Sequence, residues 1–215
     1  SDSAISAMTA LVIPAELESA SQIRFERDFG EFNRGYRQLD YDFQFFSEMQ
    51  ERGVPVWEVG AGANMAFRRD VFELVGLFDE RLGAGAAGCS EDSEIWYRIL
   101  ANHLKIRYEP RAVIWHSHRI DGEAFRRQME QYMRGHVASL LVQFEKFHHF
   151  GNLRRLLVSL PHHYWRLATG REHGTMRGTV WFEILACLRG VLFYLRSAKG
   201  TRLPTRPSLR IRAIR

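Results

Sequence analysis

The sequence has only two cysteines, Cys89 and Cys187, in 215 residues. They have neither the number nor the spacing of a disulfide framework or a zinc site, and they favour a reducing compartment. The N-terminal residues lack the charged segment and the long apolar core of a signal peptide. The apolar run Val180–Leu195 is interrupted by Glu183 and Arg189, which makes it too short and too charged to span a bilayer. We therefore expect a cytoplasmic protein.

Acidic residues are scarce in the last third of the chain. From Gly151 onward, 13 Arg and Lys residues accompany two acids, Glu172 and Glu183, whereas the first 150 residues carry a net charge of −6. This asymmetry predicts a body of residues 1–150 and a basic helical extension of residues 151–215 that faces an anionic partner. No nucleic-acid recognition motif accompanies the charge, so nucleic acid is not the expected partner.

Hydrophobic patterning predicts an α/β chain with short strands followed by amphipathic C-terminal helices. The expected strands are 10–14, 54–59, 65–67, 105–110 and 112–116. The expected helices are 15–29, 70–76, 91–103, a long helix from Asp121, 153–168 with a kink at Pro161, and 176–198. Residues 30–53 are aromatic and aperiodic, which predicts a loop with a short helix near 45–50. Asp70 and Ser90 are expected N-caps.

The stretch "SEDSE" at residues 90–94 gathers three acids in a basic chain. Carboxylates in the first turn of a helix favour its dipole, and that alone explains many such clusters. The alternative is that Asp92 or Glu91 lies at a loop–helix junction and takes a proton from an acceptor hydroxyl. Spacing alone leaves both interpretations open.

Other polar groups have structural and functional interpretations as well. His116 and His118 follow an expected strand, either as surface residues or as ligands of a cation such as Mn²⁺. The loop "GAGAN" at 60–64 is not a phosphate-binding motif, and its glycines let the backbone approach a ligand beside Asn64. Arg68 either neutralises phosphate or lies on a solvated face. The D-x-D at 40–42 is rejected as a metal site because no apolar strand leads into it.

Three segments in order carry a resemblance to a known family: "VIPAELES", "GAGANMAFRRDVFELVGLFDERLGAG" and "SEDSEIWYRILANHLKIRYEPRAVIWHSHR". Together they resemble the C-terminal half of a bacterial family 2 glycosyltransferase of the inverting GT-A type. The similar region runs from about Ala10 to Arg134. It implies the C-terminal portion of a GT-A-like fold, with residues 1–150 as the acceptor-side half of the catalytic domain.

The resemblance also implies roles. Asp92 is the expected catalytic base, and Glu91 positions the acceptor or shares the proton. Gly62, Asn64 and Met65 border the donor sugar and the acceptor. His116 is the expected third ligand of a divalent cation, Mn or Mg.

Three further expectations concern Arg68, the substrates and the turn at residues 78–79. Arg68 joins the substrate-binding residues. The donor is a nucleotide-sugar, and the acceptor is a glycan or a lipid-linked molecule, as in polysaccharide biosynthesis. The Phe78-Asp79 turn is structural support.

The chain departs from that family at two points. The nucleotide-binding half and its D-x-D are absent, which predicts an incomplete fragment that is inactive alone. Cys89-Ser90 stands where the subgroup more usually has a glycine pair.

We expect that the basic helices contact the inner face of the cytoplasmic membrane, dock on the body, or do both. The rival hypotheses are a non-catalytic carbohydrate-binding module and a peripheral membrane protein without sugar chemistry.

Overall fold

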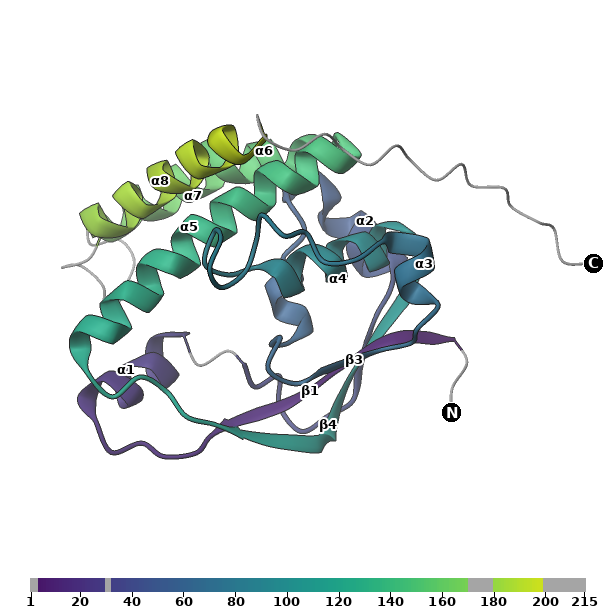
Figure 1. The fold of residues 1–215 in the computed structure, drawn as a ribbon, viewed down its shortest axis with the longest axis horizontal. Coiled ribbons are helices and arrows are strands. Elements are labelled where there is room, and N and C mark those ends of the chain that lie inside the picture. Colours follow the sequence, from purple (N-terminus) through teal and green to yellow (C-terminus); the bar gives the residue numbers. More distant parts are fainter. Residues whose placement is uncertain (1–3, 30–31, 170–179, 199–215) are drawn as a thin grey trace, which may run out of the picture.

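The structure is a computed structural model that describes residues 4–29, 32–169 and 180–198. A four-stranded mixed sheet in the order β2-β4-β1-β3 forms one layer. Its strands are β1 (Ile5–Pro14), β2 (Leu39–Tyr41), β3 (Met65–Phe67) and β4 (Lys105–His116). Helix α4 (Glu91–Ala101) lies between this sheet and the long helix α5 (Gly122–Phe147), as Figure 1 shows. The α/β class predicted from the sequence is confirmed.

The two strands expected at 105–110 and 112–116 are one continuous strand, β4, which pairs in parallel with β1. The pairing shifts after Ala10, which faces Glu109, because the next residue of β1, Leu11, faces Val113. Pro110 therefore lies in a bulge, where its missing N–H leaves no gap in the ladder. The proline interrupts the pattern of the sequence without ending the strand.

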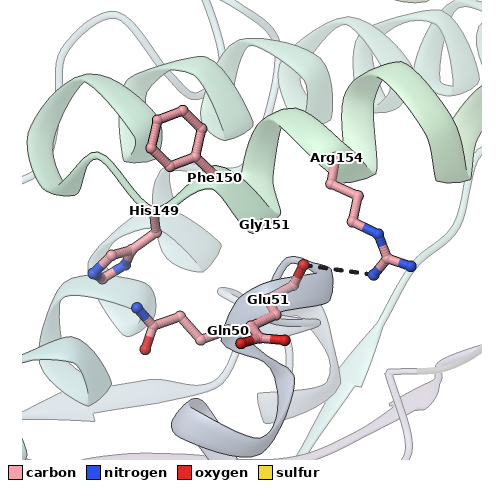
Figure 2. A pocket seen from close by; sticks show the side chains of 6 residues that line it. All are labelled: Gln50, Glu51, His149, Phe150, Gly151 and Arg154. Atoms are coloured by element: carbon pink, nitrogen blue, oxygen red, sulfur yellow. Dashed lines mark hydrogen bonds between the residues drawn. The ribbon is translucent and has the colours of Figure 1, made fainter.

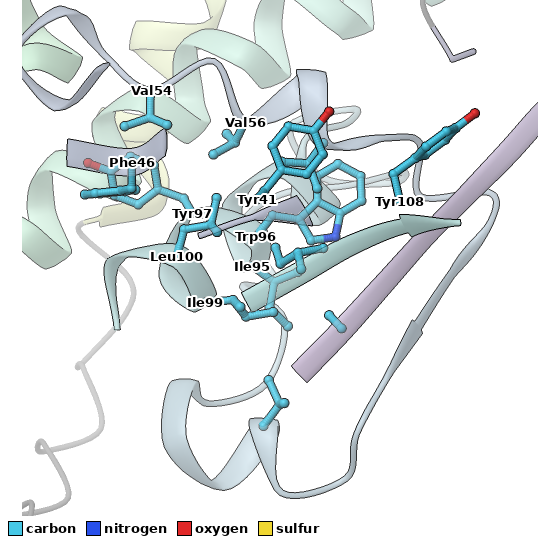
Figure 3. Packing of buried hydrophobic residues seen from close by; sticks show 14 of the residues in the cluster. Tyr41, Phe46, Val54, Val56, Ile95, Trp96, Tyr97, Ile99, Leu100 and Tyr108 are labelled. Atoms are coloured by element: carbon cyan, nitrogen blue, oxygen red, sulfur yellow. The ribbon is translucent and has the colours of Figure 1, made fainter. Parts of the chain in front are cut away.

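Helix α4 is buried nearly all round, which is typical of a core helix. Figure 3 shows its side chains packed among residues from the sheet and from the 41–56 region. Ile95, Trp96, Tyr97, Ile99 and Leu100 are fully buried. The first turn of α4 is consequently held by a rigid support.

The strand expected at 54–59 is absent, and this prediction is wrong. Val56–Val59 forms a 3₁₀ helix, η2, preceded by Pro55. Val56 and Val59 are three residues apart, which places both on one side of a 3₁₀ helix, and both are buried. The apparent alternation of the sequence thus arises from a short helical turn that packs against α4.

The region expected as a loop with one short helix contains more regular structure. It holds strand β2, helix α2 (Phe43–Met49) and a 3₁₀ turn, η1 (Gln50–Arg52). The carboxylate of Asp42 caps α2 by accepting from the main-chain N–H groups of Gln44 and Phe45. Asp40 on β2 is ion-paired with Arg107 of β4. The D-x-D pattern at 40–42 therefore serves the sheet and a helix cap.

Helix α1 (Ala20–Phe29) begins later than expected, because Ser19 and Gln22 form a capping box. The Ser19 hydroxyl accepts from the Gln22 N–H, and the Gln22 amide oxygen accepts from the Ser19 N–H at 2.9 Å. Helix α3 (Val71–Val75) lies where expected, but Asp70 makes no side-chain cap and pairs with Arg68 instead.

Helix α5 begins directly after Asp121, where the long helix was expected, and the Asp121 carboxylate caps it by accepting from the N–H of Ala124. The expected helix 153–168 is divided into α6 (Phe150–Arg154), a π-helical segment η3 (Arg155–Ser159) and α7 (Leu160–Ala168). The change of register precedes Pro161, which has no N–H for the preceding turn.

Helix α8 (Val180–Ala198) lies along α5, and Figure 1 shows the two side by side. The first residues of the helix expected at 176–198 fall outside the described residues. No helix in the described part of the chain is long and apolar enough to cross a membrane.

Candidate functional site

Asp92 lies in the first turn of α4 and contacts the glycine-rich turn. Its Oδ2 accepts a hydrogen bond from the main-chain N–H of Gly62 at 2.8 Å, and its Oδ1 accepts from the N–H of Ser93 at 2.6 Å. A Cβ added to Gly62 would lie 2.7 Å from Oδ2, so only glycine lets the turn approach this closely. The carboxylate is thus fixed by two segments 30 residues apart.

The surroundings of Asp92 make it more basic than an exposed aspartate. Burial raises its pKa above the ordinary value, although the N–H groups of Ser93 and Gly62 partly offset the rise. Burial also raises the pKa of Glu91, and the charge of Asp92 adds to it. A carboxylate with a raised pKa is a better proton acceptor, which suits a general base.

Ser90 does not cap α4 with its side chain, contrary to the expectation from sequence. It adopts a left-handed conformation with φ 72°, and its hydroxyl lies 3.0 Å from the thiol of Cys89. Cys89 in turn packs against Gly135 of α5, where a Cβ would lie 2.6 Å from Sγ. Both cysteines are free thiols. The Cys89-Ser90 pair therefore anchors the loop before α4 to α5.

Asn64 is held within the sheet by two hydrogen bonds. Its Nδ2 donates to the carbonyl of Leu11 at 3.0 Å and to that of Ala112 at 3.1 Å. These acceptors lie on β1 and β4 at the bulge, so the side chain fastens the glycine-rich turn to both strands. Met65 follows directly as the first residue of β3 and is half-buried.

Arg68 lies at the surface after β3. Its guanidinium pairs with Asp70 at 2.6 Å, and both side chains are about half exposed. Among the described residues, Arg68 and Asp92 have different hydrogen-bond partners: Arg68 donates to Asp70, and Asp92 accepts from Gly62. Its pairing is that of a solvated ion pair, which contributes little to stability.

His116 is the last residue of β4 and is half-buried. Its Nδ1 lies 3.3 Å from Nδ1 of His118, whose Nε2 lies 2.6 Å from a carboxylate oxygen of Glu26 on α1. Burial lowers the pKa of His116, and the neighbouring His118 lowers it further. His116 is therefore a neutral imidazole at neutral pH, the form that binds metal ions.

A row of aromatic rings connects the surroundings of Asp92 with the histidine pair. The charge of Asp92 is among the influences on Tyr132 of α5, whose pKa is raised to about 12, mainly by burial. The Tyr132 ring lies 6.4 Å from Phe25, and Phe25 lies 4.4 Å from the ring of His118. The sequence interpretation missed Tyr132, Phe25 and Glu26, because each appears in the sequence only as part of a helical pattern.

The Phe78-Asp79 turn packs and pairs as structural support. Phe78 contacts Phe67 and Phe72 edge to face or tilted. Burial alone would raise the pKa of Asp79, but hydrogen bonds from Arg81 and Lys146 and their positive charges lower it well below the ordinary value. Lys146 of α5 also reaches Glu94 of α4 at 2.7 Å. This network joins the turn to both helices around the site.

The described residues contain no group of three or more His, Cys, Asp or Glu side chains that could hold a metal ion. His116 is thus a single candidate ligand, and a cation at this position needs further oxygen ligands from the donor or from another segment. The neutral imidazole suits Mn²⁺, so the residue present fits the expected ion as one member of its ligand set.

A pocket of about 210 Å³ lies elsewhere, between η1 and α6. Figure 2 shows its lining residues, with Arg154 donating to the main-chain oxygen of Glu51. Gly151 allows the two segments to meet, since a Cβ there would lie 1.8 Å from the Gln50 carbonyl oxygen. None of the candidate residues lines this pocket. Its complete lining is Gln50, Glu51, His149, Phe150, Gly151 and Arg154.

Comparison with known protein families gives a match over most of the chain. The model of the family described as glycosyl transferase family group 2 matches residues 26–203. This region covers most of the chain and includes Asp92, the glycine-rich turn, both histidines and helix α8. No curated protein and no solved structure matches the chain.

Proposed function

The chain belongs to glycosyl transferase family group 2, and on this premise we propose that it forms the acceptor side of an inverting sugar transferase. The family implies a sugar donor and an acceptor. We propose that the donor is a nucleotide-sugar and that the acceptor is a glycan or a lipid-linked molecule. The observation that carries the proposal is the position of Asp92, a carboxylate of raised pKa fixed at the start of a buried helix.

Asp92 acts in this proposal as the catalytic base. It accepts the proton of the acceptor hydroxyl while that oxygen attacks the anomeric carbon of the donor sugar. The bond from this carbon to the diphosphate breaks, and the nucleoside diphosphate leaves with the electron pair. Because the attack comes from the face opposite this leaving group, the configuration inverts. The hydrogen bond from Gly62 holds the carboxylate of Asp92 in place, and the dipole of α4 favours its negative charge. The base therefore has the fixed position that this step requires.

The neighbouring residues hold the carboxylate and border the substrates. Glu91 positions the acceptor hydroxyl beside Asp92. Gly62 holds Asp92, and Asn64 fixes the turn that places Gly62 and Met65. Arg68, at the exposed end of β3, contacts the charged part of a substrate in exchange for Asp70.

His116 is proposed as one ligand of a divalent cation, Mn or Mg, that would neutralise the leaving diphosphate. The other protein ligands in this proposal belong to a D-x-D motif that follows an apolar strand. These 215 residues contain no D-x-D in such a position. The chain alone is accordingly proposed to be inactive and to need a donor-binding half.

The transfer step is tested by replacing Asp92 with Asn in a form of the protein that includes the donor-binding half. We expect loss of at least two orders of magnitude in the transfer rate, the contribution that general bases typically make. Glu123→Gln is the matched control, because Glu123 is an exposed carboxylate of α5 outside the site. Transfer that survives in Asp92→Asn would refute the proposal. If the unaltered protein binds the acceptor but transfers no sugar, the rival hypothesis of a carbohydrate-binding module is favoured.

A second proposal concerns the basic extension, residues 151–215. One side of α8 packs on α5, where Phe193 and Tyr194 contact a cluster that includes Ala138 and Val142. The opposite side exposes a stripe of large apolar residues, the α8 stripe: Trp181, Leu185, Leu188, Leu192 and Leu195. Docking on the body and contact with a further surface are thus compatible in one helix.

We propose that the α8 stripe lies on an anionic membrane surface at the cytoplasmic face. A Trp- and Leu-rich face beside basic segments is typical of interfacial helices. Residues 199–215, which follow α8 in the sequence, contain six basic residues and no acidic ones, and each such charge adds about 1 kcal/mol near an anionic surface.

Sedimentation with vesicles tests the membrane proposal. The chain should bind vesicles that contain phosphatidylglycerol and should be released by salt, with weaker binding to phosphatidylcholine alone. Replacing Trp181, Leu188 and Leu192 with Gln should abolish binding. The control replaces Leu74 and Leu77 with Gln, since these leucines are exposed near α3. Equal binding by both variants would refute the role of the stripe, as would a stripe that mediates self-association without lipid binding.

A further inference from the structure

We propose that a basic hollow on α6, η3 and α7 binds the phosphate group of an anionic lipid headgroup. The basic hollow has a volume of about 320 Å³, and its lining is Arg154, Val158, Ser159, His162, His163 and Arg166. The inference deepens the proposed membrane contact of the α8 stripe, and it rests on that contact for the presence of a lipid surface. None of the six lining residues belongs to the α8 stripe or to the Asp92 site.

The lining residues lie on one exposed face of a helical run. Four of them follow one another at intervals of four residues and are exposed: Arg154, Val158, His162 and Arg166. Residues four apart lie on the same face of a helix. The buried side chains of α7, Tyr164 and Leu167, pack with Val180 of α8 instead. This packing holds the basic face of the run toward the outside of the molecule.

The π-helical segment η3 supplies part of the lining. Val158 and Ser159 belong to η3, between Arg154 of α6 and the two histidines of α7. Short π-helical turns within α-helices are rare and occur frequently at functional sites. The change of helix type thus coincides with the place where the basic side chains gather.

The side chains of the basic hollow suit a phosphate group. Residues 151–168 contain three arginines and no acidic residue, and two of these arginines line the hollow. A guanidinium presents parallel N–H donors that match two oxygens of a phosphate. The Ser159 hydroxyl and the imidazole N–H groups are further donors. Arg154 now donates to the main-chain oxygen of Glu51 at 3.5 Å, a long hydrogen bond that a phosphate can replace.

The surroundings of the basic hollow favour a lipid over a soluble anion. Leu157, Val158 and Trp165 are exposed on the same helical run. A free phosphate in water makes no use of apolar neighbours, whereas Leu and Trp side chains insert at the boundary between headgroups and acyl chains. The volume of the hollow lies at the lower end of the range of about 300–1,000 Å³ for ligand pockets, which suits a headgroup rather than a whole lipid.

Helix α7 joins the basic hollow to the helix that carries the α8 stripe. Figure 1 shows α7 beside α8, and Tyr164 of α7 packs with Val180 of α8. The next residue on each helix is an exposed tryptophan, Trp165 and Trp181. Tryptophan is enriched where proteins meet the membrane–water interface. The two exposed surfaces are therefore neighbours, which lets one lipid surface contact both.

General attraction of positive charge to an anionic surface makes a different prediction from a phosphate site. If the arginines act only through their charge, lysine can replace them without loss. If the basic hollow binds a phosphate group, the paired N–H donors of the guanidinium are required, and lysine lacks them. Exchange of arginine for lysine therefore separates the two cases.

Sedimentation of the 215-residue chain with vesicles of phosphatidylglycerol and phosphatidylcholine provides the first test. Arg154→Lys combined with Arg166→Lys should weaken binding about tenfold, the loss expected when hydrogen bonds to a charged group are removed. Arg69→Lys combined with Arg127→Lys is the matched control, because both arginines are exposed outside the basic hollow. The control should bind as the unaltered chain does. Equal binding by the two double variants overturns the inference.

A short-chain lipid separates the basic hollow from the α8 stripe. In ¹⁵N–¹H correlation spectra, dihexanoyl-phosphatidylglycerol below its micelle concentration should shift the main-chain N–H signals of residues 154–166 to saturation. These shifts should disappear in the double variant of Arg154 and Arg166. They should persist when Trp181, Leu188 and Leu192 are replaced with Gln, because no bilayer is involved. Failure of the basic hollow is thereby distinguished from failure of the stripe.

Inorganic phosphate is the last probe, because it carries the same anion without acyl chains. It should bind about tenfold more weakly than the short-chain lipid, since it gains no apolar contact. Equal affinity for the two would overturn the lipid assignment and indicate a soluble phosphate ligand. Lipid-induced shifts that leave residues 154–166 unaffected would overturn the site itself.

Discussion

The main-chain N–H of Gly62 donates to Oδ2 of Asp92 at 2.8 Å, and this hydrogen bond joins the glycine-rich turn to the first turn of α4. The turn is itself fastened to β1 and β4 through Asn64. The proposed base is therefore positioned by the sheet as well as by its own helix. A change at Gly62 should consequently affect Asp92 more than the rest of the fold.

Gly62→Ala should displace the Asp92 carboxylate, because the new Cβ would lie 2.7 Å from Oδ2. We expect a destabilisation of about 1–3 kcal/mol, the usual range for overpacking, and a transfer rate lower by about 10²-fold for a misplaced base. Urea unfolding and the transfer assay measure the two effects. Gly122→Ala is the matched control, since its Cβ would meet only Ser21 Oγ at 3.9 Å. Equal effects of the two changes would contradict the proposed geometry.

The raised pKa of Asp92 predicts how stability depends on pH. Between the unfolded-state pKa of about 3.9 and the higher folded-state pKa, the folded chain binds more protons than the unfolded chain. Stability from this group is therefore fully present below the unfolded pKa and is lost as pH rises through the folded pKa. The stability difference between the unaltered chain and Asp92→Asn, measured by urea unfolding at several pH values, should fall in this interval. A difference that rises there would show that the shift has the opposite sign.

Glu94 is a fully buried carboxylate that pairs with Arg98 at 2.8 Å and with Lys146 at 2.7 Å. Glu94→Ala should cost about 3–5 kcal/mol, because it leaves buried positive charge without its partner. Guanidinium unfolding monitored by circular dichroism measures the loss. Glu123→Ala is the control, since Glu123 forms an exposed pair with Arg127 and should cost about 0.3–0.5 kcal/mol. A small effect at Glu94 would mean that the network contributes little.

Ser90→Gly should stabilise the chain by about 0.5–1 kcal/mol. Ser90 has φ 72°, a conformation that costs non-glycine residues about 1–2 kcal/mol. Its side chain makes no cap that would be lost, and the contact of its hydroxyl with the Cys89 thiol at 3.0 Å is a weak one. The greater freedom of glycine in the unfolded chain offsets part of the gain. Ser93→Gly, inside α4, should instead destabilise by about 1 kcal/mol. Thermal unfolding compares the two, and a lower melting temperature for Ser90→Gly would contradict the account.

The backbone at Ser90 also explains a position at which this sequence departs from the family pattern. The glycine pair that the family resemblance implies at positions 89 and 90 would suit the left-handed backbone at position 90, because glycine adopts that conformation without strain. Position 89 has a different explanation. Cys89 fits because Gly135 of α5 leaves room for its thiol. The absence of a side chain at Gly135 thus keeps the contact between the loop and α5 close.

The long helices and the helix that carries Asp92 were predictable because their patterns are local. The apolar period of α5 and the capping Asp121 lie within one segment, and the same holds for the stripe Ile95, Ile99 and Leu100. The site residues Asp92 and His116 were identified from motif resemblance rather than from patterning. Their roles stay proposals, since no finding beyond family membership tests them.

Other features were not predictable because several local patterns fit the same residues. Residues 54–59 have the alternation of a strand, but Val56–Val59 forms a 3₁₀ helix. Pro110 interrupts the pattern of a strand that continues through a bulge. In both cases the neighbouring element decided: η2 packs on α4, and β1 supplies the ladder for β4. Sequence spacing contains no information on such neighbours.

By itself, the sequence determined the class of the fold, the family and the charge asymmetry, because composition, periodicity and ordered motifs are properties of short segments. Only the tertiary structure decided which side chains meet. Glu26 and His118 are 92 residues apart in the chain, and Gly62 and Asp92 are 30 apart. These contacts form because burying the apolar faces of α1, α4 and the sheet brings distant segments together, and hydrogen bonding then satisfies the polar groups that this burial removes from water.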